Sequence, residues 1–286
     1  MKKISSFKIK NKQFHIYIYK NKKYIRKIFT NPKEKKNYLN EIKAYKIFNK
    51  QKVFRTVKFY KNGKSLNGYF LDLEFVNGKR PNLFDLKNIY KLKNNNLEKE
   101  NINKYLKRLS KNYLKKRILN KKNINYLFIN FKLKNQFDVI TTHTHGDFAM
   151  YNCVKLKNVF YVFDLEKYSK RIFIFDLINW FVHPFIYNLA KIISFKNLKL
   201  LNNYILKIIY FHIYLLYLIL IFLFNLKINF KEYKIYYFLY LTEKSLICKT
   251  DLYKIKNKKE KNIIRNFYNI VDFYINKLLR EINNVY

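Results

Sequence analysis

The stretch that decides the fold is HGDFAMYN, residues 145–152, which is followed after a further twelve residues by Asp164 in the sequence DLE. Asp147 and Asn152 lie five positions apart on one short polar loop, and Asp164 ends the next strand-like run, NVFYVFDLE. Transfer of a phosphoryl group requires a carboxylate that accepts the proton of a hydroxyl, and oxygen ligands for the Mg²⁺ on the phosphates. Asp147, Asn152 and Asp164 can supply these groups, because Mg²⁺ prefers hard oxygen ligands.

The combined pattern, HxDxxxxN followed by D-x-E, resembles the kinase-like small-molecule phosphotransferases, the family of aminoglycoside phosphotransferases and choline kinases. The resemblance covers residues 144–184 and includes Asp176 in IFIFDLINWF, which matches an Asp on the helix that follows in that family. It implies an α+β, bilobal protein-kinase-like fold. We expect a small β-rich N-lobe over residues 1–78 and a large, mostly helical C-lobe over residues 79–286.

The resemblance also implies roles for individual residues. Asp147 would be the catalytic base that orients the acceptor hydroxyl, and His145 would brace the catalytic loop. Asn152 and Asp164 would bind Mg²⁺, and Glu166 would act on a second metal ion or on its own loop.

Two further polar residues near the motif are expected to be structural. Asp176 would hold the large lobe together, and His143 lies one strand alternation before His145. Neither is assigned to the chemistry.

The N-terminal region agrees with this family by position. Lys27 in YIRKIF lies where a strand lysine would reach the phosphates, and Lys23 and Arg26 are its close competitors. Glu41 in LNEIKAY lies where a helix glutamate would pair with that lysine.

The connector between the lobes is predicted in LDLEFVNGK, where the backbone from Glu74 to Val76 would meet the adenine edge. One feature departs from the kinase pattern, because SFKIKNKQF contains no glycine-rich phosphate loop. Phe148, Ala149 and Met150 also replace the usual polar or proline residues of the catalytic loop, so the acceptor pocket cannot be read by analogy.

Periodicity predicts the elements that carry these motifs. QFHIYIYKN and KKYIRKIF alternate as strands of a hairpin, and the sequence Thr30-Asn31-Pro32 marks the start of a helix. VFRTVKFYKNGK and NGYFLDLEFVNG are typical of two more strands. Residues 84–131 consist mostly of Leu-, Ile- and Lys-rich segments of helical length, and everything after about residue 173 is predicted to be helical.

The composition is strongly basic, with a formal net charge of +42. Only 8 of the 60 basic residues are Arg, the better residue for binding phosphates and base edges. Lys accompanies Asn, Ile, Tyr and Phe throughout, as an A+T-biased coding sequence would produce, so we expect no specific nucleic-acid partner. A peripheral contact with an anionic membrane stays open as an alternative.

The two cysteines show no metal-ligand spacing, and the first residues lack the apolar segment of a signal peptide. A cytoplasmic location is expected, with the inner face of the membrane as a variant of it. Residues 208–224 carry no formal charge. This length is at the lower limit for a membrane span. We favour a buried helix of the large lobe over a span.

The leading hypothesis is an ATP-dependent kinase that uses Mg²⁺ and phosphorylates a hydroxyl of a small molecule. A sugar, or a glycolipid or polysaccharide precursor, is ranked first because only 18 acidic residues are present to bind a polycation such as an aminoglycoside. A choline or ethanolamine kinase, an inactive kinase-fold binding module and a basic membrane-associated protein are the alternatives.

Overall fold

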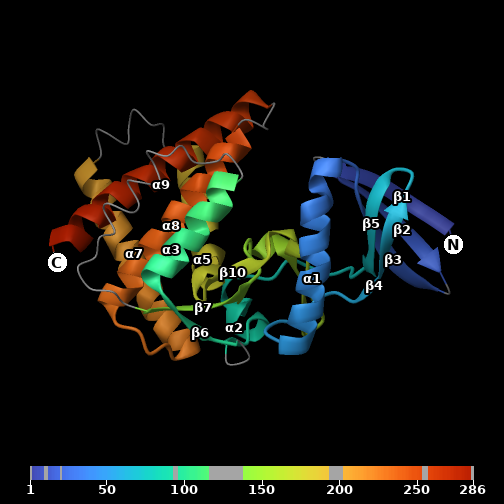
Figure 1. Ribbon diagram of the computed structural model, residues 1–286, viewed down its shortest axis with the longest axis horizontal. Helices are drawn as coiled ribbons and strands as arrows, with labels where there is room; N and C mark the ends of the chain where they lie inside the picture. Colours follow the sequence, from blue (N-terminus) through green and yellow to red (C-terminus); the bar gives the residue numbers. More distant parts are fainter. Residues whose placement is uncertain are drawn as a thin grey trace. The chain divides into compact units, whose positions relative to one another are not determined.

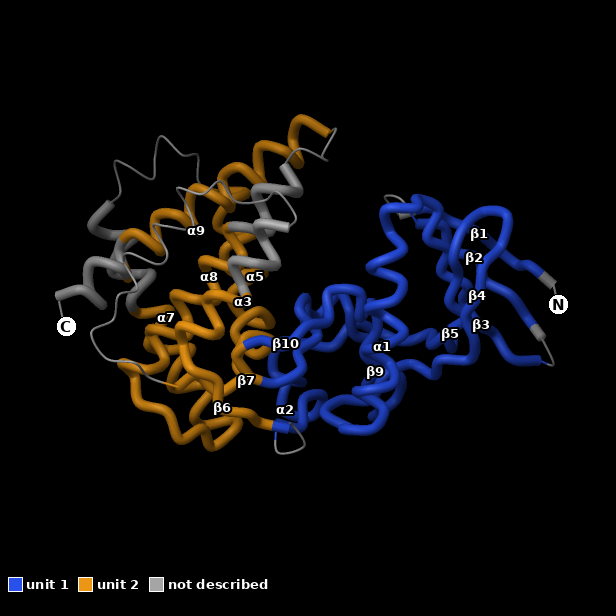
Figure 2. Tube along the Cα trace, viewed as in Figure 1, with its two compact units in different colours: residues 1–96, 142–171 blue, residues 97–141, 172–286 orange. Residues whose placement is uncertain are grey.

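The computed structural model describes residues 2–9, 12–19, 21–92, 96–115, 138–192, 202–252 and 257–284. The chain forms two compact units, and neither is a continuous segment (Figure 2). Unit 1 comprises residues 1–96 and 142–171, and unit 2 comprises residues 97–141 and 172–286. The HGDFAMYN and DLE stretches therefore group with the N-terminal sheet. The predicted lobe boundary at residue 78 stays a prediction.

Unit 1 is built on a five-stranded antiparallel sheet with the order β1-β2-β3-β5-β4 (Figure 1). The expected hairpin is present, since its two strands pair in register from Lys12 opposite Phe29 to Tyr19 opposite Lys22. The strands are β1 (Lys2–Ile9), β2 (Lys12–Tyr19), β3 (Lys22–Phe29), β4 (Phe59–Ser65) and β5 (Gly68–Glu74).

Helix α1 (Lys35–Gln51) begins where the sequence predicts a helix start. The side chain of Asn31 accepts a hydrogen bond from the Lys33 N–H and caps the short 3₁₀ turn Pro32–Glu34 that leads into α1. Its buried residues are spaced three or four apart, apart from one adjacent pair, and so form one face: Tyr38, Glu41, Ala44, Tyr45 and Phe48. The unit is completed by 3₁₀ turns, by α2 (Leu86–Ile89) and by a hairpin of β8 (Cys153–Leu156) and β9 (Val159–Val162).

Unit 2 is mainly helical. Its core is aromatic, with Trp180 of α5 fully buried and Tyr240 of α8 donating a hydrogen bond to Asn179 Oδ1 at 2.8 Å. Ser245 Oγ donates to Asp272 Oδ1 at 2.8 Å and joins α8 to α9. The helices are α3 (Ile102–Lys115), α5 (Phe175–Ile192), α7 (Asn202–Phe224), α8 (Phe230–Leu252) and α9 (Lys258–Asn284).

The region predicted to be helical between residues 84 and 131 contains a strand that its sequence does not reveal. β6 (Glu98–Asn101) has the sequence EKEN and pairs with β7 (Asp138–Thr144), which in turn lies beside β10 (Ser169–Ile172). Glu100 is buried there because Arg108 binds its carboxylate with two nitrogens. Residues 116–131 of the prediction lie outside the described residues.

Helix α7 contains the apolar segment 208–224. Among its described side chains, one face is buried through Ile213, Leu216 and Leu220. The other face is also apolar but exposed, and comprises Phe211, Tyr214, Leu215, Leu218 and Phe222. Within the described ranges, no helix combines the length and apolar character that crossing a bilayer requires.

Phe48 connects α1 to the rest of the unit 1 core. Its ring centroid lies 4.4 Å from that of Phe54 and 5.7 Å from that of Tyr168. We expect Phe48→Ala to lower the free energy of unfolding by about 3–5 kcal/mol, because removing a buried Phe leaves a cavity. Leu39→Ala on the exposed face of the same helix is the control, and denaturant unfolding is the measurement. An equal, small loss in both variants would contradict this assignment of the core.

Candidate active site

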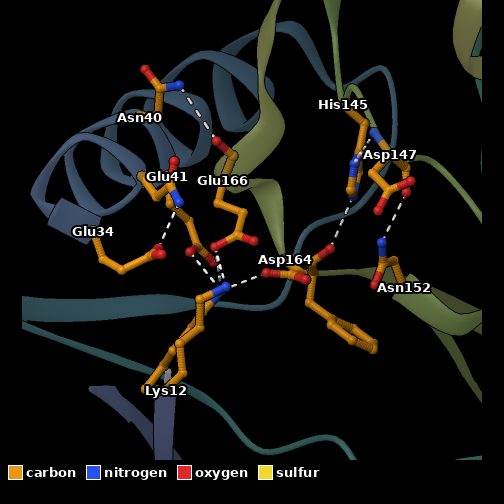
Figure 3. A network of polar contacts seen from close by, with 12 residues as sticks. Lys12, Glu34, Asn40, Glu41, His145, Asp147, Asn152, Asp164 and Glu166 are labelled. Atoms are coloured by element: carbon orange, nitrogen blue, oxygen red, sulfur yellow. Dashed lines mark hydrogen bonds and ion pairs between the residues drawn. The ribbon is translucent and has the colours of Figure 1, made fainter. Parts of the chain in front are cut away.

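The centre of the site is a lysine buried among carboxylates. Figure 3 shows three of the acidic residues, Glu41, Asp164 and Glu166, gathered there. Lys27 is 3% exposed, and its Nζ donates to Glu41 Oε2 at 2.8 Å and to Asp164 Oδ1 at 2.5 Å. Strand β3 thus supplies the ammonium, α1 supplies one carboxylate and the loop after β9 supplies the other. The structure brings together three residues that are far apart in the sequence and were predicted from it.

The competitors of Lys27 are placed elsewhere. Arg26 binds Asp72 through Nε and Nη2 at 2.7 and 2.8 Å, and Lys23 is exposed. Of the three candidates on β3, Lys27 is therefore the one that reaches the carboxylates of Glu41 and Asp164.

Burial and charge act in opposite directions on these groups. Burial raises the pKa of Glu41 to about 7, although the Lys27 ammonium acts against this rise. Burial would also raise the pKa of Asp164, but the ammonium of Lys27, with help from Lys12, holds it below its ordinary value. For Lys27, burial alone would lower the pKa, but the nearby carboxylates raise it well above the ordinary value. Lys27 thus stays charged, and Asp164 is its ionised partner.

His145 joins the loop of Asp147 to the loop of Asp164. Its buried ring makes a 2.9 Å contact from Nε2 to the carbonyl oxygen of Phe163, and Nδ1 accepts the N–H of Asp147 at 3.3 Å. Because Nδ1 accepts, the ring proton belongs on Nε2, where it can donate to Phe163. This histidine therefore links the backbone N–H of Asp147 to the backbone carbonyl of Phe163, the residue before Asp164.

Gly146 brings the same two loops into direct backbone contact. Its φ is +85°, and a Cβ added there would lie 2.2 Å from the carbonyl oxygen of Lys167. Only glycine fits both the conformation and the space. Arg171 strengthens the junction by donating from Nη1 to the Gly146 carbonyl at 3.0 Å.

Asp147 and Asn152 are held on the same loop. Asn152 is buried, and its Nδ2 donates to the backbone carbonyl of Asp147 at 2.8 Å. Its side-chain oxygen is therefore the atom suited to bind a metal ion. The Tyr151 hydroxyl donates to Asp147 Oδ1 at 3.0 Å, so that carboxylate accepts a hydrogen bond from a hydroxyl group in the structure.

The residues fit a divalent metal ion. Among the described residues, carboxylate oxygens of Glu41, Asp164 and Glu166 lie within 4.8 Å of one another. Within the described part of the chain, Glu41 Oε1 is buried without a hydrogen-bond partner. A donor set of hard oxygens with one uncompensated buried oxygen matches the preference of Mg²⁺.

The remaining predicted residues lie as follows. Glu74 ends β5, where its N–H donates to the Lys58 carbonyl at 2.8 Å, and Val76 follows in the connector. Asp176 is buried in the first turn of α5 within unit 2. His143 Nδ1 lies 2.6 Å from the Tyr168 hydroxyl.

Two residues of the site were not found from the sequence. Lys12, the first residue of β2, forms an ion pair with Glu166, and Asn40 donates to the backbone carbonyls of Glu166 and Tyr168 at 3.4 Å each. No local pattern marks either one, because each meets its partner more than a hundred positions away. Their contacts fix the DLE loop against β2 and α1.

Gly146→Ala should destabilise unit 1. A non-glycine residue at positive φ costs about 1–3 kcal/mol, and here the added methyl group also meets backbone that cannot rotate away. We expect a loss of at least about 2 kcal/mol in the free energy of unfolding, measured in denaturant. Gly63→Ala is the matched control, because its added methyl meets only the Phe70 side chain. Equal stability of the two variants would refute the close approach.

Glu41→Gln should change how stability depends on pH. The folded pKa of about 7 lies above the ordinary value of 4.5, so the folded state holds this proton more tightly and wild type loses stability as pH rises through that window. The amide cannot titrate. We therefore expect the free energy of unfolding of the variant, relative to that of wild type, to increase between about pH 5 and about pH 8. Denaturant unfolding in the presence of a metal chelator is the measurement. A difference that stays constant with pH would contradict this.

Solved structures of other proteins share this architecture. No family model and no curated protein matches the chain. Among solved structures, a putative fructosamine-3-kinase from Haemophilus somnus 129PT has a TM-score of 0.57 at 13% identity, covering 98% of this chain and 92% of that one. A thermostable mutant of aminoglycoside phosphotransferase APH(4)-Ia has a TM-score of 0.56 at 8% identity, covering 98% and 95%. The amicoumacin kinase hAmiN, in complex with AMP-PNP, Ca²⁺ and Ami, has a TM-score of 0.50 at 13% identity, covering 94% and 87%. The chain therefore has the bilobal, kinase-like fold of these small-molecule phosphotransferases.

Proposed function

We propose that this protein is an ATP-dependent phosphotransferase that phosphorylates a hydroxyl group of a small molecule. The observation that carries the proposal is the set of contacts that joins Lys27, Glu41 and Asp164 to the loop of Asp147 through His145. In kinases with this arrangement, catalysis is mostly positioning and electrostatic stabilisation of the transferred group.

The proposed roles are those that the resemblance to the kinase-like phosphotransferases implies, and contacts of the side chains support them. Asp147 accepts the proton of the acceptor hydroxyl, whose oxygen forms a bond to the γ-phosphorus while the bond to the bridging oxygen of ADP breaks. The hydrogen bond from the Tyr151 hydroxyl to Asp147 Oδ1 supports this role, because an acceptor hydroxyl would make the same contact. Lys27 binds phosphate oxygens, and Glu41 orients it.

Asn152 and Asp164 would hold the metal ion, and Glu166 is the next oxygen donor. A bound Mg²⁺ would neutralise charge on the phosphates. The backbone of the connector from Glu74 to Val76 would meet the adenine edge. The proposal places the protein in the cytoplasm, where ATP is available, with the inner face of the membrane as the variant.

A sugar, or a glycolipid or polysaccharide precursor, is the acceptor that the composition favours. A polycationic aminoglycoside needs an acidic pocket, but the chain has only 18 acidic residues, and several of these are buried with cations of the chain itself. The structural neighbours are an aminoglycoside phosphotransferase, an amicoumacin kinase and a putative fructosamine-3-kinase. Choline or ethanolamine remains the second acceptor class.

A catalytically inactive binding module is the second candidate function. The absence of glycine from the first 62 residues favours it, because a glycine-rich loop is the usual cover for the phosphates. A measurement of phosphate transfer distinguishes the two candidates, because the binding module would bind nucleotide without transferring phosphate.

The test is thermal unfolding of wild type with and without Mg²⁺ and ATP, beside Asp164→Asn and Asp147→Asn. A ligand present at about 100 times its Kd adds roughly 2.7 kcal/mol of stability. We expect a metal-dependent shift in wild type and in Asp147→Asn, and a much smaller one in Asp164→Asn. Asp138→Asn, an exposed acid at the start of β7, should behave like wild type.

Phosphate transfer from labelled ATP to sugars, amino sugars, choline and ethanolamine is then measured with the same proteins. Wild type and Asp138→Asn should transfer, and Asp147→Asn should lose at least about a hundredfold in rate because a positioned base contributes that much. Binding without transfer to any acceptor would favour the inactive module. Absence of any nucleotide shift in folded wild type would refute the proposal.

A further inference from the structure

The hairpin of β1 and β2 lacks glycine, yet its end carries a lysine directed toward the site. Lys12 opens β2 and pairs in register with Ile9, so it lies where the hairpin closes. In kinases a glycine-rich hairpin covers the phosphates with its backbone N–H groups. A side-chain cation at the same end could provide the positive charge instead.

Lys12 is already held next to the carboxylate cluster (Figure 3). Its Nζ forms an ion pair with Glu166 Oε2, and the two side chains are only 15% and 11% exposed. The same Glu166 oxygen lies 3.9 Å from Lys27 Nζ. One carboxylate of the DLE loop is therefore shared by two ammonium groups.

The two lysines differ in how firmly they are engaged. Lys27 is bound by two carboxylates, at 2.8 and 2.5 Å, and is buried from solvent. Among the ion pairs of the described residues, Lys12 contacts only Glu166, and it is the more exposed of the two lysines. Releasing Lys12 breaks one carboxylate contact, whereas releasing Lys27 would break two, so Lys12 can exchange its partner at lower cost than Lys27.

The charges of the cluster require such an exchange when polyphosphate enters. With Glu41 ionised, three carboxylates face two ammonium groups, which leaves one excess negative charge that would repel phosphate. A metal ion that draws Glu166 toward itself would release Lys12, and its ammonium would then face the phosphates.

We propose that Lys12 is a phosphate-binding residue that replaces the amides of a glycine-rich loop, and that Glu166 holds it in place until a metal–nucleotide complex binds. The inference rests on the proposed function, because it assigns a further residue to the same nucleotide site. It also gives Glu166 two successive partners, first Lys12 and then the metal ion.

The experiment compares the full-length Lys12→Met and Lys12→Arg variants with wild type by calorimetric titration with ATP, ADP, AMP and adenosine. We expect Lys12→Met to weaken the binding of ATP at least about tenfold, which is roughly 1.4 kcal/mol, and to leave the binding of adenosine unchanged. The loss should decrease from ATP to ADP to AMP, and Lys12→Arg should recover most of it. Lys8→Met, at an exposed lysine on β1, is the matched control and should bind as wild type does.

A second arm tests the role of Glu166 with a variant that is expected to strengthen ATP binding. Without metal, Glu166→Gln should bind ATP a fewfold more tightly than wild type, because it no longer competes for the Lys12 ammonium. Adding Lys12→Met to this variant should abolish that gain.

The outcomes separate the inference from the proposed function. If wild type binds ATP and Lys12→Met binds it with the same affinity, the role of Lys12 is overturned but the proposed function is not. An equal loss for adenosine and ATP would assign Lys12 to the structure of the hairpin and also overturn the inference. Failure of wild type to bind any of the four ligands would refute both.

Discussion

The burial of one ammonium group is the constraint on which the rest of this site depends. Moving an unpaired charge out of water costs several kcal/mol, so Lys27 can lie inside unit 1 only with carboxylates around it. Glu41 comes from α1 and Asp164 from the loop after β9, and both meet Lys27 at hydrogen-bonding distance. The sheet, the helix and the acidic loop are therefore fixed to one another by a single charge, and displacing any one of them would leave that charge uncompensated.

The two acidic loops are joined mainly through backbone atoms. His145 bridges an amide of one loop and a carbonyl of the other, and Gly146 lets the first loop approach the backbone at Lys167. Backbone contacts place few demands on the surrounding side chains. This explains how a chain with about one residue in ten identical to its structural neighbours retains their fold. The constraint falls on a histidine, a glycine and a few acids.

The sequence predicted several residues that the structure brings together, among them Lys27, Glu41 and Asp164. The spacing of Asp147 and Asn152 is local, so it could be found without a structure. Lys27 was chosen by position, with Lys23 and Arg26 as close competitors, because all three lie on one strand and only packing shows which is buried beside Glu41. Strand β6 was missed for a related reason: its polar sequence shows no alternation, and pairing with β7 determines its conformation. Lys12 was missed because it meets Glu166 across 154 positions.

The high positive charge of the chain and the acidic centre of its site are compatible. A surface lysine interacts with distant groups through water and salt, which screen charges beyond about 8 Å at physiological ionic strength. Glu41 and Asp164, in contrast, contact Lys27 within 2.8 Å, and the side chains of Lys27 and Glu41 are buried. Changes of composition toward lysine therefore alter the surface without altering the local field at the site. Acids are scarce in this sequence, and at the centre of the site Glu41 and Asp164 are held by direct contact with the buried Lys27 ammonium.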